Sequence, residues 1–68
     1  MWRMRMRKSE QMGVAPTDES PWVDISPSNG PPYEYATRKE AEHMLDICYR
    51  EVRRGFYTEC EVGVYETH

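Results

Sequence analysis

The chain has 68 residues, with 12 acidic against 9 basic side chains and a net charge of -3. A chain of this length buries only about 60% of the surface that it exposes when unfolded, so we expect one small, marginally stable domain over residues 1–68. No stretch has the roughly 18 apolar residues of a membrane span, and the first eight residues lack the apolar segment of a signal peptide. We therefore expect a cytoplasmic protein with no membrane partner.

Composition favours a folded domain over a disordered chain. Two Trp, five Tyr, one Phe and five Met supply large apolar side chains where aliphatic residues are few. The two cysteines, Cys48 and Cys60, are too few for a disulfide scaffold, and we expect both to be reduced and buried.

Strict alternation in the opening residues predicts the first strand. Large apolar side chains alternate with arginines there: Trp2, Met4 and Met6 against Arg3, Arg5 and Arg7. Because successive residues of a strand point to opposite faces, one face is apolar and the other carries three guanidinium groups. Lys8 adds a fourth base, and residues 1–8 contain no acid.

Residues 8–21 are polar and interrupted by Gly13, Pro16 and Pro21. Glycine and proline at this density mark irregular backbone. We predict a long loop here, mobile unless something binds it.

Two short strands are expected next. In residues 22–26, Val23 and Ile25 fall on one face, with Trp22 and Asp24 on the other. The pair Asn29-Gly30 adopts positive φ easily, which predicts a tight reversal before a third strand at residues 33–36.

Residues 38–54 predict a single helix. Thr37 and Glu40 have the spacing of a capping box at its start, and Gly55 stands where a left-handed C-terminal cap is favoured. Helical spacing aligns a narrow apolar stripe that we expect to be buried, made of Ala41, Leu45, Cys48 and Val52.

Residues 56–66 alternate once more and predict the last strand. One face is expected to point to the core: Phe56, Thr58, Cys60, Val62 and Val64. The other face carries Tyr57, Glu59, Glu61 and Tyr65.

These elements predict an α+β fold in β-β-β-α-β order, with a small, mostly antiparallel sheet of three to four strands and one helix packed on one face. The second sheet face is then open. We expect it to display Asp24 together with the residues of a candidate partner-binding surface: Arg3, Arg5, Arg7, Trp22, Tyr57, Glu59, Glu61 and Tyr65.

No pattern points to catalysis, a cofactor or a metal. The chain has no glycine-rich phosphate loop, no Gly-x-Ser-x-Gly and no paired-carboxylate motif, and we expect no enzyme activity and no cofactor. His43, Cys48, Cys60 and His68 have no metal-ligand spacing, and both cysteines fall on apolar faces, so no metal site is expected.

The basic first strand leaves two interpretations open. Arg3, Arg5 and Arg7 can pair across the sheet with Glu59, Glu61 and Glu66, which we favour because opposite charges then face each other. Alternatively, these arginines and Lys8 bind nucleic acid, although twelve acids and a pI near 5.3 oppose that.

Trp, Tyr and Arg are enriched in interface hot spots, so the open face favours a small non-enzymatic protein-interaction module. A homodimer is a further expectation, since small sheets with long edges pair readily.

Residues 21–66 place a strand, a strand, a capped helix and a final strand in the order "PWVDIS...PPYEYATRKEAEHMLDICYREVRRGFYTECEVGVYE". This pattern resembles short proteins of tailed bacteriophages and is similar to small phage inhibitors of host RNA polymerase. The resemblance implies a viral host-takeover protein that binds and modulates a host protein in the host cytoplasm. It supplies no functional residues.

Overall fold

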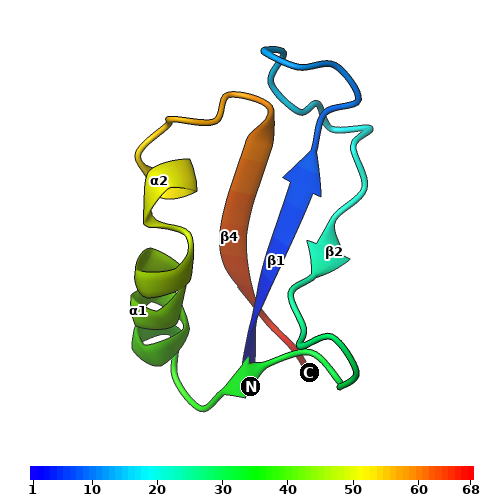
Figure 1. The fold of residues 1–68 in the computed structure, drawn as a ribbon. Coiled ribbons are helices and arrows are strands. Elements are labelled where there is room, and N and C mark those ends of the chain that lie inside the picture. The colour runs from blue at the N-terminus through cyan, green and yellow to red at the C-terminus, as the bar shows by residue number, and fades with distance from the viewer.

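The computed structural model describes residues 1–68 as a four-stranded antiparallel sheet with one main helix, which confirms the α+β class (Figure 1). In chain order the elements are β1 Trp2–Lys8, β2 Val23–Asp24, β3 Glu34–Tyr35, α1 Arg38–Cys48, α2 Arg50–Arg53 and β4 Cys60–Glu66. Neither helix has the length and apolar character needed to cross a bilayer.

Strand β1 is the centre of the sheet. All seven of its residues pair with β4, from Trp2 opposite Glu66 to Lys8 opposite Cys60. Backbone bonds extend this ladder at both ends, where Ser9 N–H donates to Glu59 O at 2.8 Å and Thr67 N–H donates to Met1 O at 2.8 Å. The expectation that the first and last strands are neighbours is confirmed.

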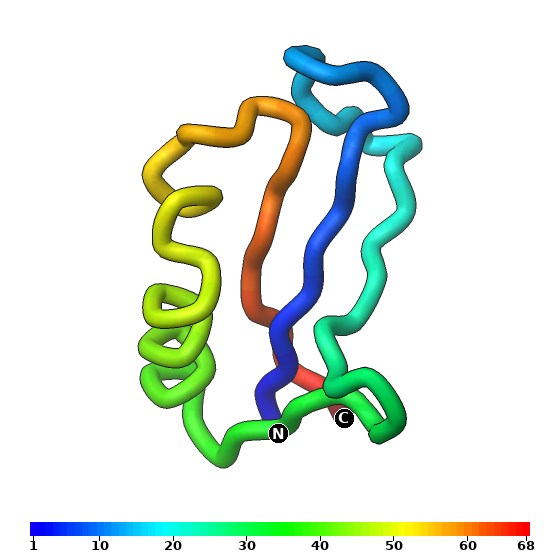
Figure 2. The backbone as a smooth tube through the Cα atoms, in the orientation of Figure 1, coloured from blue at the N-terminus to red at the C-terminus, as the bar shows by residue number.

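Strands β2 and β3 share the other edge of β1. Asp24 lies opposite Arg5, and Glu34 lies opposite Arg3 further along the same strand. Because β4 occupies one edge of β1 completely, both short strands must lie along the second edge, and Figure 2 shows the segment that carries β2 on the side of β1 away from β4. Residues 26–33 leave this edge and return to it, and Tyr33 N–H donates to Ile25 O at 3.3 Å where the excursion closes.

The predicted tight reversal at Asn29-Gly30 is therefore wrong in its geometry. The turn is closed by Gly30 N–H donating to Pro27 O at 3.3 Å, and neither Asn29 nor Gly30 has a positive φ. The mirror-image turns that need positive φ serve strands that pair with each other. Here both flanking strands pair with β1 instead, so an ordinary turn is sufficient.

The predicted single helix is interrupted. Thr37 Oγ1 accepts a hydrogen bond from Glu40 N–H at 3.2 Å and caps α1, but the reciprocal bond of a capping box, from Thr37 N–H to the Glu40 carboxylate, does not form. Tyr49 then leaves the helical region, with φ -131° and ψ 36°, and separates α1 from α2. The helix is interrupted at Tyr49, and the Tyr49 ring packs, partly buried, against the core.

Two contacts stabilise the region after the break. Arg53 of α2 reaches back to α1 and pairs with Glu42 at 2.8 Å and Asp46 at 2.9 Å. Gly55, with φ 86°, then ends α2, where Gly55 N–H donates to Val52 O and Phe56 N–H donates to Glu51 O. This bond pair is the Schellman pattern, which needs a left-handed residue and confirms the predicted glycine cap.

The core is small and lies between α1 and the sheet. Met4 and Leu45 are almost fully buried, at 2% and 1% exposure, and Ile25 and Ala41 complete the buried set. Met6, Tyr35, Met44, Tyr49, Val62 and Val64 pack partly buried around them. In Figure 1, α1 lies beside β4 and away from β2, which leaves Val23 exposed.

Three predicted core residues are exposed, namely Cys48, Phe56 and Thr58. Cys48 is exposed because α1 ends there, and Tyr49 rather than Cys48 turns toward the core. Phe56 is 70% exposed because β4 begins only at Cys60, so Phe56 lies in the preceding turn and has no strand face. Cys60 itself is half-buried.

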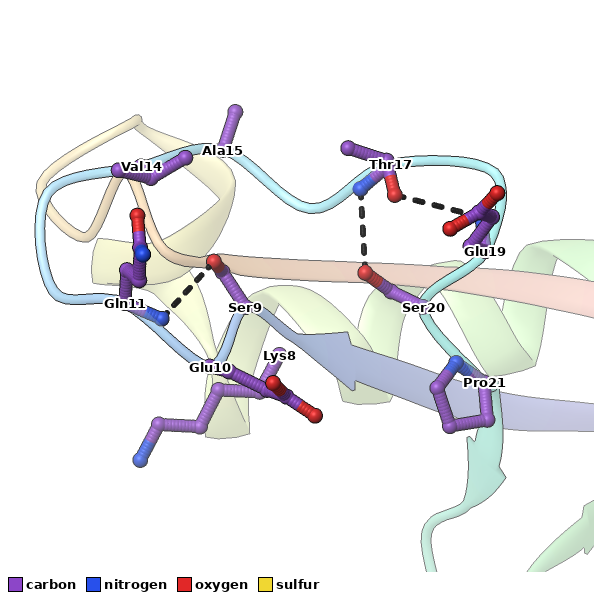
Figure 3. Close-up of a pocket in the computed structure, with 10 residues that line it drawn as sticks. All are labelled: Lys8, Ser9, Glu10, Gln11, Val14, Ala15, Thr17, Glu19, Ser20 and Pro21. Atoms are coloured by element: carbon purple, nitrogen blue, oxygen red, sulfur yellow. Dashed lines mark hydrogen bonds between the residues drawn. The ribbon is translucent and has the colours of Figure 1, made fainter.

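Residues 9–22 form irregular backbone at the end of the sheet opposite the two termini (Figure 1). Short-range hydrogen bonds shape this loop, among them Gln11 N–H to Ser9 Oγ at 3.2 Å and Thr17 N–H to Ser20 Oγ at 3.1 Å (Figure 3). Its mobility stays a prediction.

Replacing Leu45 with Ala should lower the free energy of unfolding by about 2 to 5 kcal/mol, because it empties a packed site in a core with few other members. Chemical denaturation followed by circular dichroism measures the change. Ile47→Ala is the matched control, since Ile47 is 58% exposed on the same helix and its truncation should have a small effect. Equal losses for the two variants would contradict the assigned helix face.

A thiol reagent applied to the native protein should label Cys48 rapidly and Cys60 more slowly, because only Cys48 is exposed. Single variants Cys48→Ser and Cys60→Ser assign the two rates, measured as absorbance of the released chromophore. Faster labelling of Cys60 would contradict the position of the helix break.

Candidate functional site

The open sheet face is the surface opposite α1, and its side chains form one continuous set of contacts. It consists of alternate residues of β1 and β4 with their neighbours across β2 and β3: Arg3, Arg5, Arg7, Trp22, Asp24, Glu34, Glu61, Gly63 and Tyr65. The other alternate residues, such as Met4 and Val64, point to the core. Strand alternation therefore separates the arginines from the apolar residues, as the sequence predicts.

Arg3 is held at one end of the open sheet face by two carboxylates. Its guanidinium lies 3.5 Å from Asp24 Oδ2 and 3.5 Å from Glu34 Oε2. Tyr65 completes this cluster, because its hydroxyl donates a hydrogen bond to the Asp24 carboxylate. Side chains from all four strands meet here.

Hydrogen bonding within this cluster shifts two pKa values. The bond from Tyr65 to Asp24 raises the pKa of Tyr65, since ionising the phenol would place a second negative charge beside the carboxylate. Desolvation acts in the same direction, and Arg3 partly opposes it. The pKa of Arg3 is also raised, first by its interaction with Tyr65 and then by the charges around it. At neutral pH, Tyr65 is therefore a hydrogen-bond donor and Arg3 a fixed cation.

Arg5, in the middle of the face, has a different environment. Its Cζ lies 4.4 Å from the centroid of the Trp22 ring and 4.9 Å from the centroid of the Tyr65 ring. It forms no ion pair within the protein, and it lies opposite Gly63 in the register of β1 and β4. Two aromatic rings hold this guanidinium in position while its charge has no acidic partner.

Arg7 combines both kinds of contact. Its Cζ lies 4.5 Å from the Trp22 ring centroid, and its Nη2 donates to both Glu61 oxygens, at 3.1 and 3.2 Å. The side chain is only 14% exposed, so its charge is largely covered by Trp22 and Glu61. Trp22 thus contacts two arginines and links the edge at β2 to the centre of the sheet.

The structure brings six of the eight predicted site residues together: Arg3, Arg5, Arg7, Trp22, Glu61 and Tyr65. Tyr57 is not among them, because it lies in the turn after α2 and its hydroxyl donates to Glu51 at 3.3 Å. Glu59 precedes β4 and forms no ion pair. The last strand starts later than its alternation suggests, so Tyr57 was misplaced and Glu59 extends the ladder only through its backbone.

The predicted cross-strand charge pairs form in only one case. Arg7 pairs with Glu61, but Arg3 uses Asp24 and Glu34, and Arg5 has no acidic partner. Glu66 forms no ion pair. The role of Glu34 was missed because no local pattern reveals that β3 lies beside β1. Asp24 was correctly assigned to this face with Trp22.

Two other features of the protein, a hollow in the loop and the candidate metal ligands, do not indicate a functional site. A hollow of about 320 Å³ lies inside the loop of residues 8–21, and only two of its ten lining residues are hydrophobic (Figure 3). Every side chain around it belongs to one loop and its flanking residues. No group of three or more His, Cys, Asp or Glu side chains has a geometry that could hold a metal ion.

Comparison with known proteins found no matching family model, no matching curated protein and no matching solved structure. The resemblance to short phage proteins stays a prediction, and any function must be argued from the open sheet face itself.

The Tyr65 hydrogen bond predicts a pH-dependent stability. Because the folded-state pKa lies above the ordinary value of about 10, the bond stabilises the fold fully below that pH, and its contribution is lost as pH rises through the folded pKa. Asp24→Asn should lower the pKa of Tyr65, measured by tyrosinate absorbance with Tyr65→Phe as the subtraction control. An unchanged pKa in Asp24→Asn would contradict the assigned cause.

A double-mutant cycle with Arg7→Met and Glu61→Gln should give a coupling of roughly 0.2 to 1 kcal/mol that shrinks as salt is added. The same cycle with Arg5→Met and Glu61→Gln is the control and should give a smaller coupling, because Arg5 lies opposite Gly63 rather than Glu61. Thermal denaturation measures all four free energies. Additivity of Arg7 and Glu61 would contradict this ion pair.

Proposed function

We propose that this protein is a small, non-enzymatic interaction module that binds another protein through its open sheet face. One observation carries the proposal: Arg5 is held between Trp22 and Tyr65 without an acidic partner of its own. Trp, Tyr and Arg are the residues most enriched in interface hot spots, where rigid side chains lose little entropy on binding.

The charge pattern favours a protein over a nucleic acid. The three arginines of this face lie among three carboxylates, Asp24, Glu34 and Glu61. A polyphosphate backbone gains affinity from several free cations, and these carboxylates would repel it. A protein surface needs only a complementary arrangement of single charges, which a neutral face with one unpaired arginine provides.

The resemblance to small phage proteins supports a more specific proposal. The module would act in the cytoplasm of a bacterial host, where it would bind and modulate a host protein such as RNA polymerase. The interaction would alter the partner's activity by occupying a surface, because the module needs no catalytic group for that role.

An affinity experiment with bacterial lysate tests the proposal. The tagged protein should recover one host protein in stoichiometric amount, and Trp22→Ala should abolish that recovery because it removes the ring that contacts both Arg5 and Arg7. Tyr57→Ala is the matched control: Tyr57 is an exposed aromatic residue outside the face and should be dispensable.

Circular dichroism must first establish that Trp22→Ala is folded; if it is not, Arg5→Met replaces it in the same comparison. Recovery that does not depend on this face would contradict the proposal. Recovery of nucleic acid instead, with a gel shift that weakens steeply as salt is raised, would favour the basic strand as a nucleic-acid site.

A further inference from the structure

Gly63 lies in the middle of β4 without a conformational reason to be glycine. The pairing of β1 with β4 runs without interruption from Cys60 to Glu66, so there is no bulge. The φ of Gly63 is not positive, unlike those of Gly13 and Gly55. A Cβ at Gly63 would meet no atom within 4 Å. A glycine inside a strand weakens it, and it often marks a place where a ligand or another chain approaches closely.

We call the open position at Gly63 the Gly63 notch, because the open sheet face has no side chain there and a Cβ would meet no atom within 4 Å. Glu61 and Tyr65 flank Gly63 along β4, and Arg5 lies directly across from it on β1. The floor of the notch is the backbone of Gly63 itself. A partner's side chain that enters there comes beside the one arginine of this face that has no acidic partner.

The Arg5 guanidinium is available to such a partner. It forms no side-chain hydrogen bond with the protein, and none of its nitrogens is among the buried polar atoms that lack a partner, which are Arg3 Nε and Arg7 Nε. Its nitrogens are therefore accessible to solvent. The rings of Trp22 and Tyr65 contact the guanidinium and restrict its rotation, which lowers the entropy lost when an anion binds.

We infer that the Gly63 notch receives an acidic side chain, Asp or Glu, of the bound protein, and that Arg5 pairs with this carboxylate. The inference rests on the proposed function and names the chemistry of its partner. A guanidinium presents its N–H groups in a planar fork, and a carboxylate accepts two of them in parallel. The three arginines and three carboxylates of the open sheet face sum to zero, so the face lacks the net positive charge that favours a chain of phosphates, and Arg5 offers a pairing site for a single carboxylate.

Short random peptides, displayed and selected against the immobilised protein, test this inference. Selected peptides should share one acidic position, and replacing that residue by its amide should abolish binding. Arg5→Met should weaken the selected peptides roughly tenfold or more, as loss of a charge-assisted pair does. Arg5→Lys keeps the charge but not the planar fork and should give an intermediate affinity.

Gly63→Val tests the notch separately from the charge. It should fill the notch and weaken the peptides comparably, while its melting temperature stays equal to or above that of the unaltered protein, because valine suits a regular strand. Arg54→Met is the control for net charge; Arg54 forms no ion pair and lies at the end of α2, so this variant should bind normally.

The results separate this inference from the proposed function. Peptides that share no acidic position, or that bind Arg5→Met and Gly63→Val normally while Trp22→Ala fails, would overturn the carboxylate site and leave the interaction face standing. Failure of every peptide to bind would contradict the carboxylate site, while recovery from the lysate, tested with Trp22→Ala, still decides the proposed function. Single-stranded DNA that binds in an Arg5-dependent manner and displaces the peptides would replace the carboxylate with a phosphate.

Discussion

The alternation of Met and Arg along β1 is the constraint on which the rest of the structure depends. Strand β1 is the only element that pairs with all three other strands, and every sheet contact passes through it. Its even positions supply Met4 to the core, while its odd positions supply the three arginines of the open sheet face. A slip of one residue in its register would exchange these two sets, so the fold and the candidate site are specified by the same pattern.

Because the core is small, both faces of the sheet contribute to the stability of the fold. Only four residues are buried, so apolar burial against α1 provides limited stabilisation. The second face adds aromatic rings, ion pairs and one phenol–carboxylate hydrogen bond between strands that are far apart in the sequence. Through their contacts with the arginines, Trp22 and Asp24 connect the edge of the sheet at β2 to the central strand β1. The same contacts that orient Arg5 therefore also support the sheet.

The residues of the open sheet face differ in whether their charges are used within the fold. Arg3 and Arg7 are compensated by carboxylates, and their charges mainly connect strands. Arg5 contacts the rings of Trp22 and Tyr65 but has no ion pair, and Gly63 has no side chain to pack. We propose the interaction site at these two positions, because the charge of Arg5 and the space at Gly63 are not used by the protein's own side chains.

Local patterns in the sequence by themselves determined the strand alternation of β1, the Thr37 cap, the Gly55 cap and the α+β class, because each depends on neighbouring residues. The tertiary structure alone decided that β2 and β3 lie along one edge of β1, which brings Glu34 to Arg3 and leaves Arg5 opposite Gly63. It also decided the helix break at Tyr49, whose partly buried ring packs against the core, and the exposure of Cys48. Register and burial arise from contacts between distant segments, and no local spacing encodes them.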